Sequence, residues 1–123
     1  MTAASEAMSQ AHAPYSEFQV GAALRAKDGA VFTGCNVENA SYGLTVCAER
    51  VAVFSAIAAG HRCFTAMAVV SSGDAFPYPC GACRQVLAEF CPASLEVHTA
   101  RARRLDTFET FRLGDLLPKA FKF

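Results

Sequence analysis

The chain has 123 residues, of which 53% are hydrophobic and 18% are charged, and its 11 basic and 11 acidic residues balance. This length predicts a single domain over residues 1–123 that buries a core without disulfides, and the lack of a basic excess disfavours a nucleic-acid partner. The high apolar content favours association of subunits, although the many alanines could also account for it.

The first residues contain no basic segment followed by an apolar stretch, so we expect no signal peptide and a cytoplasmic location. No apolar run approaches the roughly 18 residues that a membrane span needs, which predicts no membrane partner. Thiols in a reducing compartment serve as metal ligands or small buried groups rather than disulfides. Cys35, Cys63 and Cys91 are predicted to be buried, because apolar or aromatic residues lie nearby and no second cysteine stands at ligand spacing.

The first part of the chain predicts one helix and a β-hairpin. Residues 3–11 are good or tolerable helix formers, and the Ala-Pro pair at 13–14 ends that helix because a residue before proline avoids the helical region. A strand over 18–26 follows, with apolar residues at period two on one face. An Asp-Gly turn within 27–30 leads into a second strand over 31–36.

The rest of the chain alternates helices with strands. The expected segments are a loop over 37–45, a helix over 47–59, a strand over 67–71, a loop over 72–79, a helix over 80–90, strands over 95–98 and 107–111, and a short helix over 114–117. The helix over 47–59 is expected to bury one apolar side, made of Val51, Phe54, Ile57 and Ala58. This order implies a three-layer α/β/α domain with a five-stranded mixed sheet.

Two cysteine motifs stand where a loop enters a predicted helix. The segment Val46-Cys47-Ala48-Glu49-Arg50 places a thiol, a carboxylate and a guanidinium within one turn, and Pro79 precedes Cys80 and Cys83. The last two thiols are three residues apart and therefore share a helix face. Helix N-termini favour deprotonated sulfur. Three cysteines can bind zinc and leave its fourth position open, as in a catalytic site.

The residues alone leave other interpretations open. Cys80 and Cys83 could form a redox pair, or could join Cys47 and a fourth ligand in a closed structural zinc site. The histidines stand at no ligand spacing to a cysteine. Glu49 could be an ordinary acid at a helix start, favoured by the helix dipole. Beside a zinc centre it is instead the candidate for proton transfer.

The charge of such a centre gives Arg50 a predicted role. Zinc(II) with three thiolates carries a surplus negative charge, which makes bound water less acidic than metal-assisted hydrolysis requires. A guanidinium that donates hydrogen bonds to the sulfurs would withdraw part of that charge. Arg50 is close enough in sequence to do so.

Longer stretches of the chain resemble the small, homotetrameric type of cytidine deaminase, an enzyme of pyrimidine salvage. The matching stretches span nearly the whole chain in order and lie at 13–16, 18–24, 34–40, 47–50, 79–86 and 116–121. The chain departs from the family in its shorter leading helix, in Gly43, where Pro or Ser is common, and in the early end of its tail. None of these departures touches the chemistry.

The resemblance implies zinc-dependent hydrolytic deamination of cytidine and 2′-deoxycytidine. Cys47, Cys80 and Cys83 would hold one zinc ion per subunit, which activates a water for attack at C4 of the base. Glu49 would take the proton of that water, deliver it to ring N3 and help ammonia to leave.

The resemblance also implies a set of substrate contacts. Asn36 and Glu38 would hold the ribose hydroxyls, Phe18 would pack on the base, and the Ala48 backbone N–H would meet the base carbonyl. Phe121 is expected to reach the pocket of a neighbouring subunit in a homotetramer. From the residues alone, Phe18 could instead be a core residue, Asn36 a turn residue and the tail a frayed terminus.

Two alternative functions follow from the same motifs. One is a zinc deaminase for another aminopyrimidine compound, such as blasticidin S, and the other is a non-catalytic zinc-stabilised binding module. The Asn36-x-Glu38 pair favours a ribose and hence a nucleoside. The charge of Glu38 would repel a phosphate on the sugar, which disfavours a nucleotide or polynucleotide substrate.

Overall fold

The fold is a five-stranded sheet with helices on both faces. The computed structural model describes residues 1–122. Its elements are α1 (Thr2–Met8), β1 (Val20–Ala26), β2 (Val31–Cys35), the 3-10 turn η1 (Tyr42–Leu44), α2 (Ala48–Ala58), β3 (Phe64–Ser71), α3 (Gly81–Phe90), β4 (Glu96–Arg101), β5 (Arg104–Arg112) and α4 (Leu113–Leu116). None of the helices in this described range has the length and apolarity that crossing a membrane requires.

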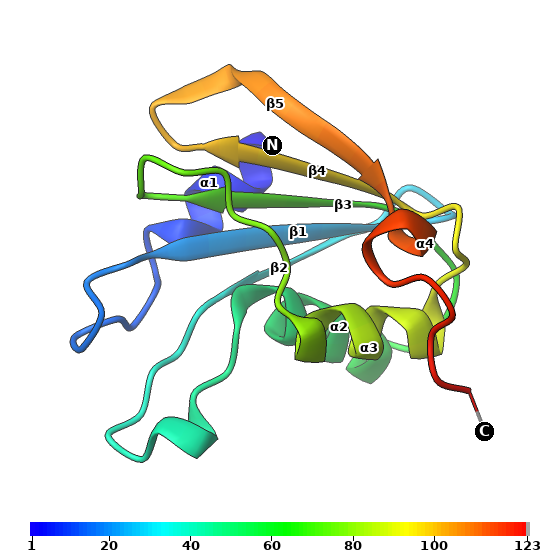
Figure 1. Cartoon of the computed structure of the whole chain (residues 1–123), viewed down its shortest axis with the longest axis horizontal. Coiled ribbons are helices and arrows are strands. Elements are labelled where there is room, and N and C mark those ends of the chain that lie inside the picture. Colours follow the sequence, from blue (N-terminus) through cyan, green and yellow to red (C-terminus); the bar gives the residue numbers. More distant parts are fainter. Residues whose placement is uncertain (123) are drawn as a thin grey trace.

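The strands lie in the order β2-β1-β3-β4-β5. The pair β3 and β4 is parallel and the other three pairs are antiparallel, which confirms the predicted mixed sheet. The parallel pair needs a crossover connection, and α3 supplies it. Figure 1 shows α1 on one face of the sheet and α2 and α3 next to each other on the opposite face. The predicted three-layer arrangement is therefore confirmed.

Small residues let α1 lie close to the sheet. Ala23 and Ala68 of the sheet pack with Ala4 of α1 in a core of their own, separate from the larger core under α2 and α3. A side chain at Gly21 would collide with the backbone of Ala4 and Met8. Both faces of β1 are thus buried, whereas the alternation of apolar residues in the sequence predicted a single buried face.

The buried face of α2 differs from the predicted one. Its inward residues are Ala48, Glu49, Ala52, Val53 and Ala56, whereas Phe54 is 51% exposed. This helix is apolar on most sides, so the spacing of apolar residues fits more than one face. The small residues face inward because α2 packs closely against β2. Glu49 is among the residues that this close packing buries.

Gly34 on β2 permits this approach, and its replacement by alanine is expected to destabilise the fold. A methyl group there would lie 2.5 Å from the Ala48 carbonyl oxygen and 2.5 Å from the Ala52 amide nitrogen. Overpacking of this kind costs about 1–3 kcal/mol in the free energy of unfolding, measurable by urea denaturation. Gly43→Ala is the control, because nothing lies within 4 Å of a methyl group at that position. Equal stability of the two variants would contradict the close packing.

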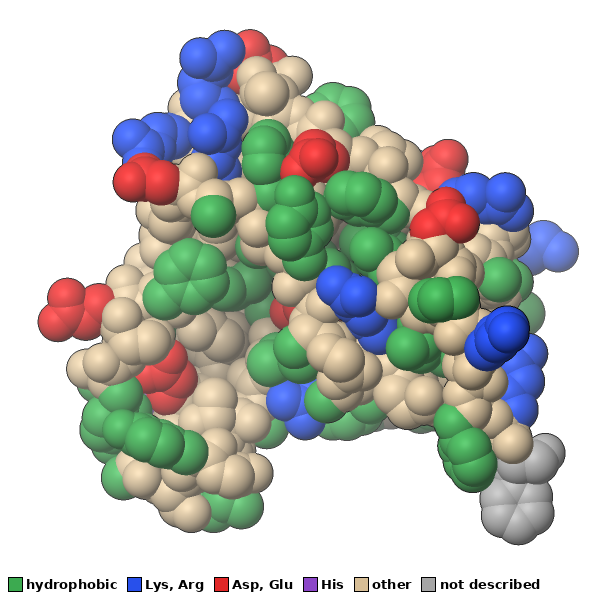
Figure 2. All heavy atoms as spheres, in the orientation of Figure 1, with side chains coloured by type: hydrophobic (Ala, Val, Ile, Leu, Met, Phe, Trp, Pro, Cys, Tyr) green, Lys and Arg blue, Asp and Glu red, His purple; other side chains and the backbone are tan. Residues whose placement is uncertain are grey.

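Other segments differ in smaller ways. The first helix ends at Met8, and β5 is longer than expected, because a tight turn at 102–103 joins it directly to β4. The prediction for Cys63 is wrong, since this residue is exposed after the end of α2, whereas Cys35 and Cys91 are partly buried. Hydrophobic side chains gather over β5 and the segment before α3 on the face drawn in Figure 2.

Candidate metal centre and adjoining cavity

Three cysteine sulfurs converge where α2 and α3 begin. Cys47 occupies the N-cap position of α2, Cys80 occupies that of α3, and Cys83 lies in the first turn of α3. The Cys47 and Cys80 sulfurs are 3.9 Å apart, the Cys80 and Cys83 sulfurs 3.3 Å, and all three lie within 4.8 Å of one another. Tetrahedral zinc–thiolate bonds of about 2.3 Å place sulfurs about 3.8 Å apart. The soft donors and their spacing therefore fit one zinc ion.

Local hydrogen bonds fix the backbone before each helix. Val46, directly before Cys47, exchanges two backbone hydrogen bonds of 3.0 Å with Val37. Pro79, directly before Cys80, has its carbonyl oxygen 2.6 Å from Nε of Arg84, and Nη1 of that arginine donates to the Leu116 carbonyl at 2.8 Å. Both segments that lead into the cysteines are thus held by contacts outside the sulfurs themselves.

Arg50 lies against the sulfurs, as its predicted role requires. Its Nη2 donates to the Cys47 sulfur at 3.4 Å. A hydrogen bond from the Cys83 thiol, together with the guanidinium of Arg50, lowers the pKa of Cys47 to about 5. The same hydrogen bond, together with burial, raises the pKa of Cys83. Metal binding requires thiolates, so the guanidinium favours the protonation state that binds zinc.

Glu49 is the buried acid of the centre. Its side chain is only 6% exposed, and this burial, with a contribution from the charge of Cys47, raises its pKa to about 7. A carboxyl group with a pKa near neutral can both accept and donate a proton at physiological pH, which is the property required of a general acid–base.

A cavity of about 230 Å³ opens beside these residues. It is lined by Ser16, Phe18, Val20, Asn36, Glu38, Thr45, Cys47, Ala48, Glu49, Val69, Pro77, Tyr78 and Cys80. The structure thus brings the four predicted substrate-binding residues to the same cavity as Glu49 and two of the sulfurs. Sequence reasoning missed the contribution of Tyr78, although its position two residues before Cys80 is a signal that could have found it.

Asn36 is buried at the end of β2 with half of its hydrogen-bonding capacity free for a ligand. Its Oδ1 accepts from the Val20 amide at 2.9 Å, and its Nδ2 donates to the Phe18 carbonyl at 2.8 Å. A side-chain amide has two donor hydrogens and two acceptor lone pairs, so one of each remains. Asn36 therefore both orients the segment before β1 and offers a donor and an acceptor to a ligand.

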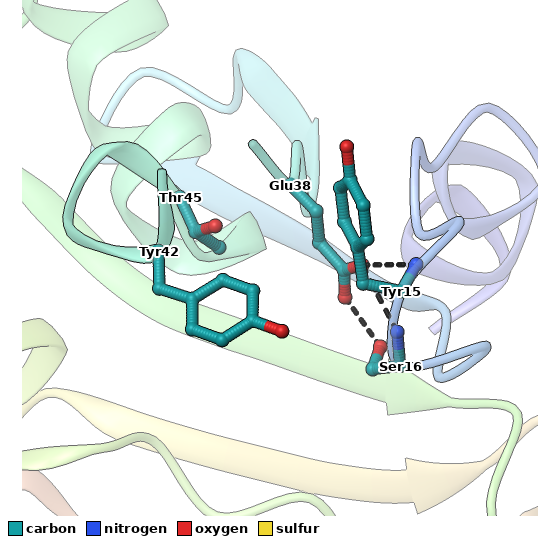
Figure 3. A pocket seen from close by; sticks show the side chains of 5 residues that line it. All are labelled: Tyr15, Ser16, Glu38, Tyr42 and Thr45. Carbon is teal, nitrogen blue, oxygen red and sulfur yellow. Dashed lines mark hydrogen bonds between the residues drawn. The ribbon is translucent and has the colours of Figure 1, made fainter. Parts of the chain in front are cut away.

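Glu38 joins this cavity to an outer pocket of about 320 Å³, which is lined by Tyr15, Ser16, Glu38, Tyr42 and Thr45. Figure 3 shows the carboxylate between the segments that carry the two tyrosines. It accepts hydrogen bonds from the Ser16 hydroxyl and from the amides of Ser16 and Tyr15, and these bonds lower the pKa of Glu38. The outer pocket shares three residues with the inner one and continues it outward.

The remaining predicted site residues lie as follows. Phe18 precedes β1 and is 41% exposed, so it is not a core residue, and its ring lies against Gly73. Ala48 begins α2, where a backbone N–H has no acceptor within the helix. Phe121 is 75% exposed and lines a different hollow near Phe90, so the chain's own metal cavity does not contain it.

The three cysteines form the metal-ligand group found within residues 1–122, and no histidine in that range joins them. A closed site with four protein ligands is therefore not what the described residues form. An open coordination position beside a buried acid is the arrangement of a catalytic zinc site.

Comparison with known proteins agrees with this geometry. The family model of the cytidine and deoxycytidylate deaminase zinc-binding region matches residues 1–99. A cytidine deaminase of Halalkalibacterium halodurans is 50% identical over 116 residues, which cover 94% of this chain and 86% of that protein. One from Sporosarcina psychrophila is 48% identical over 116 residues, covering 94% and 84%.

The likeness extends to the fold. The crystal structure of cytidine deaminase from Burkholderia pseudomallei superposes with a TM-score of 0.91 at 53% identity, covering 98% of this chain and 94% of that one. The match includes the part of the chain that carries the three cysteines and Glu49. The chain therefore belongs to the cytidine and deoxycytidylate deaminase zinc-binding family.

Proposed function

We propose that residues 1–123 form a single domain that catalyses the zinc-dependent hydrolytic deamination of cytidine and 2′-deoxycytidine. The products are uridine or 2′-deoxyuridine and ammonia. The observation that carries this proposal is one cavity that joins cysteine metal ligands, a buried carboxyl group and polar groups suited to a sugar. The identity to known cytidine deaminases supports the same reaction.

Cys47, Cys80 and Cys83 would hold the zinc ion, which would supply Lewis acidity that makes water a nucleophile at neutral pH. Glu49 accepts the proton of that water and delivers it to ring N3 of the base. The water oxygen bonds to C4, and Glu49 moves its remaining proton to the amino group, so that the C4–N bond breaks, ammonia leaves and the C4 carbonyl forms. The near-neutral pKa and the burial of Glu49 suit these transfers.

The other residues orient the nucleoside. The Phe18 ring packs on the base, and the Ala48 backbone N–H donates to the base carbonyl. Asn36 uses its free donor and acceptor for a ribose hydroxyl, and Glu38 accepts from another. The carboxylate of Glu38 is already held by the Ser16 hydroxyl and by two amides, so it is oriented before the substrate arrives.

A nucleoside fits this cavity better than a nucleotide. Glu38 lines both the inner and the outer pocket, and its lowered pKa keeps it charged at neutral pH. A phosphate on the sugar would approach that charge and be repelled. Blasticidin S is less favoured, because Asn36 and Glu38 together suit a ribose. A binding module without catalysis would have no need of a buried proton carrier.

Ammonia release by the purified, zinc-loaded protein tests the proposal. Cytidine and 2′-deoxycytidine should both release ammonia, whereas cytidine 5′-monophosphate and blasticidin S should react far more slowly. Release from blasticidin S alone would move the assignment to that rival substrate. No release from any compound by a protein that holds zinc would instead favour the binding module.

Arg50→Ala is expected to preserve the fold and to lower turnover or zinc affinity about 10- to 100-fold, the usual effect of losing a group that supports a metal ligand. The reason is the loss of the hydrogen bond to the Cys47 sulfur and of the positive charge beside it. Cytidine turnover and zinc content per chain measure the effect. Arg62→Ala is the control, since that guanidinium donates to the carbonyls of Ile57 and His61, at and after the end of α2. Unchanged turnover and metal content in Arg50→Ala would remove the role.

We further propose a cytoplasmic homotetramer that works in pyrimidine salvage. Several large apolar side chains support subunit association, because they are exposed in the single chain: Tyr42, Leu44, Phe54 and Phe121. Phe121 would complete the cavity of a neighbouring subunit, which its distance from its own chain's cavity permits. Native mass spectrometry should find four chains, and a monomer at micromolar concentration would contradict this assembly.

A further inference from the structure

Tyr78 is an aromatic residue of the cavity for which the reaction proposed above has no use. It lies in the loop between β3 and α3, two residues before the metal ligand Cys80, and lines the cavity together with Phe18. Its side chain is 50% exposed. The two rings come from different loops, one before β1 and one before α3, so the cavity has aromatic residues from two segments of the chain.

Strand β5 fixes the orientation of this ring. The Tyr78 hydroxyl donates to Oε1 of Glu109 at 2.5 Å, and the ring packs edge-on against Phe111, with centroids 5.6 Å apart and an interplanar angle of 79°. Glu109 and Phe111 are two residues apart and therefore lie on the same face of β5. The hydroxyl is committed to the carboxylate, so the ring rather than the oxygen is available to a ligand.

The loop that carries Tyr78 is anchored at a second place. The Arg101 guanidinium lies 4.7 Å from the centroid of the Phe76 ring, and its Nη1 donates to the Asp74 carbonyl at 3.4 Å. Arg103 forms an ion pair with the Asp74 carboxylate. The end of β4 and the turn after it thus hold the first part of the loop, while β5 holds its last part. A ring held in this way needs little rearrangement to meet a substrate.

We propose that Tyr78 is a substrate-binding residue of the nucleoside cavity and that Glu109 is a positioning residue that holds the Tyr78 ring. The proposal rests on the deaminase function proposed above. Aromatic side chains bind bases through their faces and edges without needing a particular hydrogen-bond pattern. A preformed aromatic ring strengthens the binding of the substrate and of the transition state equally. Its loss should therefore raise KM and leave kcat nearly unchanged.

Steady-state kinetics with cytidine test the substrate-binding role of Tyr78. Tyr78→Ala should raise KM about tenfold, within the range that base–aromatic contacts contribute, while kcat stays within about twofold and zinc stays at one ion per chain. Uridine should bind about tenfold more weakly to the same variant in calorimetry. An unchanged KM in Tyr78→Ala would overturn the proposal. So would a loss of zinc or a fall in kcat at constant KM, because these indicate a distorted metal centre.

A double-mutant cycle tests the positioning role. Tyr78→Phe keeps the ring and loses its hydroxyl, and Glu109→Ala loses the acceptor, so each should raise KM by about two- to threefold. Because both remove the same hydrogen bond, the double variant should be no worse than either single variant. Glu109→Gln, which retains an acceptor oxygen, should behave like the wild type. Additive effects, or a Glu109→Gln variant as impaired as Glu109→Ala, would overturn the role of Glu109.

Failure of this inference can be told apart from failure of the proposed function. A wild-type protein that releases no ammonia from cytidine would refute the function. A wild-type protein that does so, with Tyr78→Ala showing the wild-type KM, would refute only the role of Tyr78.

Discussion

Replacing Glu49 by glutamine is expected to reduce cytidine turnover by roughly a hundred- to ten-thousand-fold, the usual contribution of a general acid–base group. Glutamine has nearly the same shape and can occupy the same buried position, where the native side chain is 6% exposed. It cannot accept the proton of water or deliver one to the base. Ammonia release under single-turnover conditions measures the loss directly.

The zinc content of the Glu49→Gln protein should remain at one ion per chain, because the proposed metal ligands are the three cysteines and not this acid. Glu6→Gln is a matched control, since this acid is exposed on α1, across the sheet from the centre. If Glu49→Gln kept more than a tenth of the wild-type turnover with full zinc content, Glu49 would not be the proton carrier.

Replacing Cys83 by serine is expected to abolish zinc retention and with it the activity. Cys83 is fully buried in the first turn of α3, and its sulfur lies 3.3 Å from that of Cys80. A serine hydroxyl stays protonated near neutral pH and is a poor substitute for a soft thiolate. Loss of a group that only supports a ligand costs about 10- to 100-fold, so loss of a ligand should exceed a hundredfold in metal affinity.

Zinc per chain, measured by atomic emission after dialysis, should fall well below one in Cys83→Ser, and turnover should fall in proportion. Cys63→Ser is the control, because this thiol is exposed and stands apart from the metal centre. Equal zinc content in the two variants would show that Cys83 is not a ligand.

The metal centre was predictable because its signals are local. The Cys-x-x-Cys spacing at one helix start predicts that two thiols share a face, and a third thiol and an acid stand together at another helix start. The sugar contacts needed more, since Asn36 and Glu38 were suggested by resemblance to a family. Their approach to the same cavity depends on the pairing of β1 with β2, and their roles stay predictions.

Features that depend on distant packing were harder to predict. The inward face of α2 was predicted incorrectly because the helix is apolar nearly all round, and the close contact at Gly34 decided which residues face inward. The contact that holds the Tyr78 ring was not predictable, because its partner Glu109 is 31 residues away, on a strand whose register no local pattern reveals. Cys63 was expected to be buried because apolar or aromatic residues lie nearby in the sequence, yet the turn after α2 leaves it exposed.

The placement of the ligands on two separate helices has a consequence for unfolding. Cys47 and Cys80 are 33 residues apart in the chain, so an ion bound to both closes a loop of that length, as a covalent cross-link would. In the chain-entropy description, closing a loop of this length lowers the conformational entropy of the unfolded chain. This raises the free energy of the unfolded state by about 4 kcal/mol if the ion stays bound to both cysteines in that state. Loss of zinc should first separate the starts of α2 and α3, because the ion links them. The cavity residues at these two helix starts should move apart with them. The surrounding sheet, held by its own strand pairing, should outlast that separation.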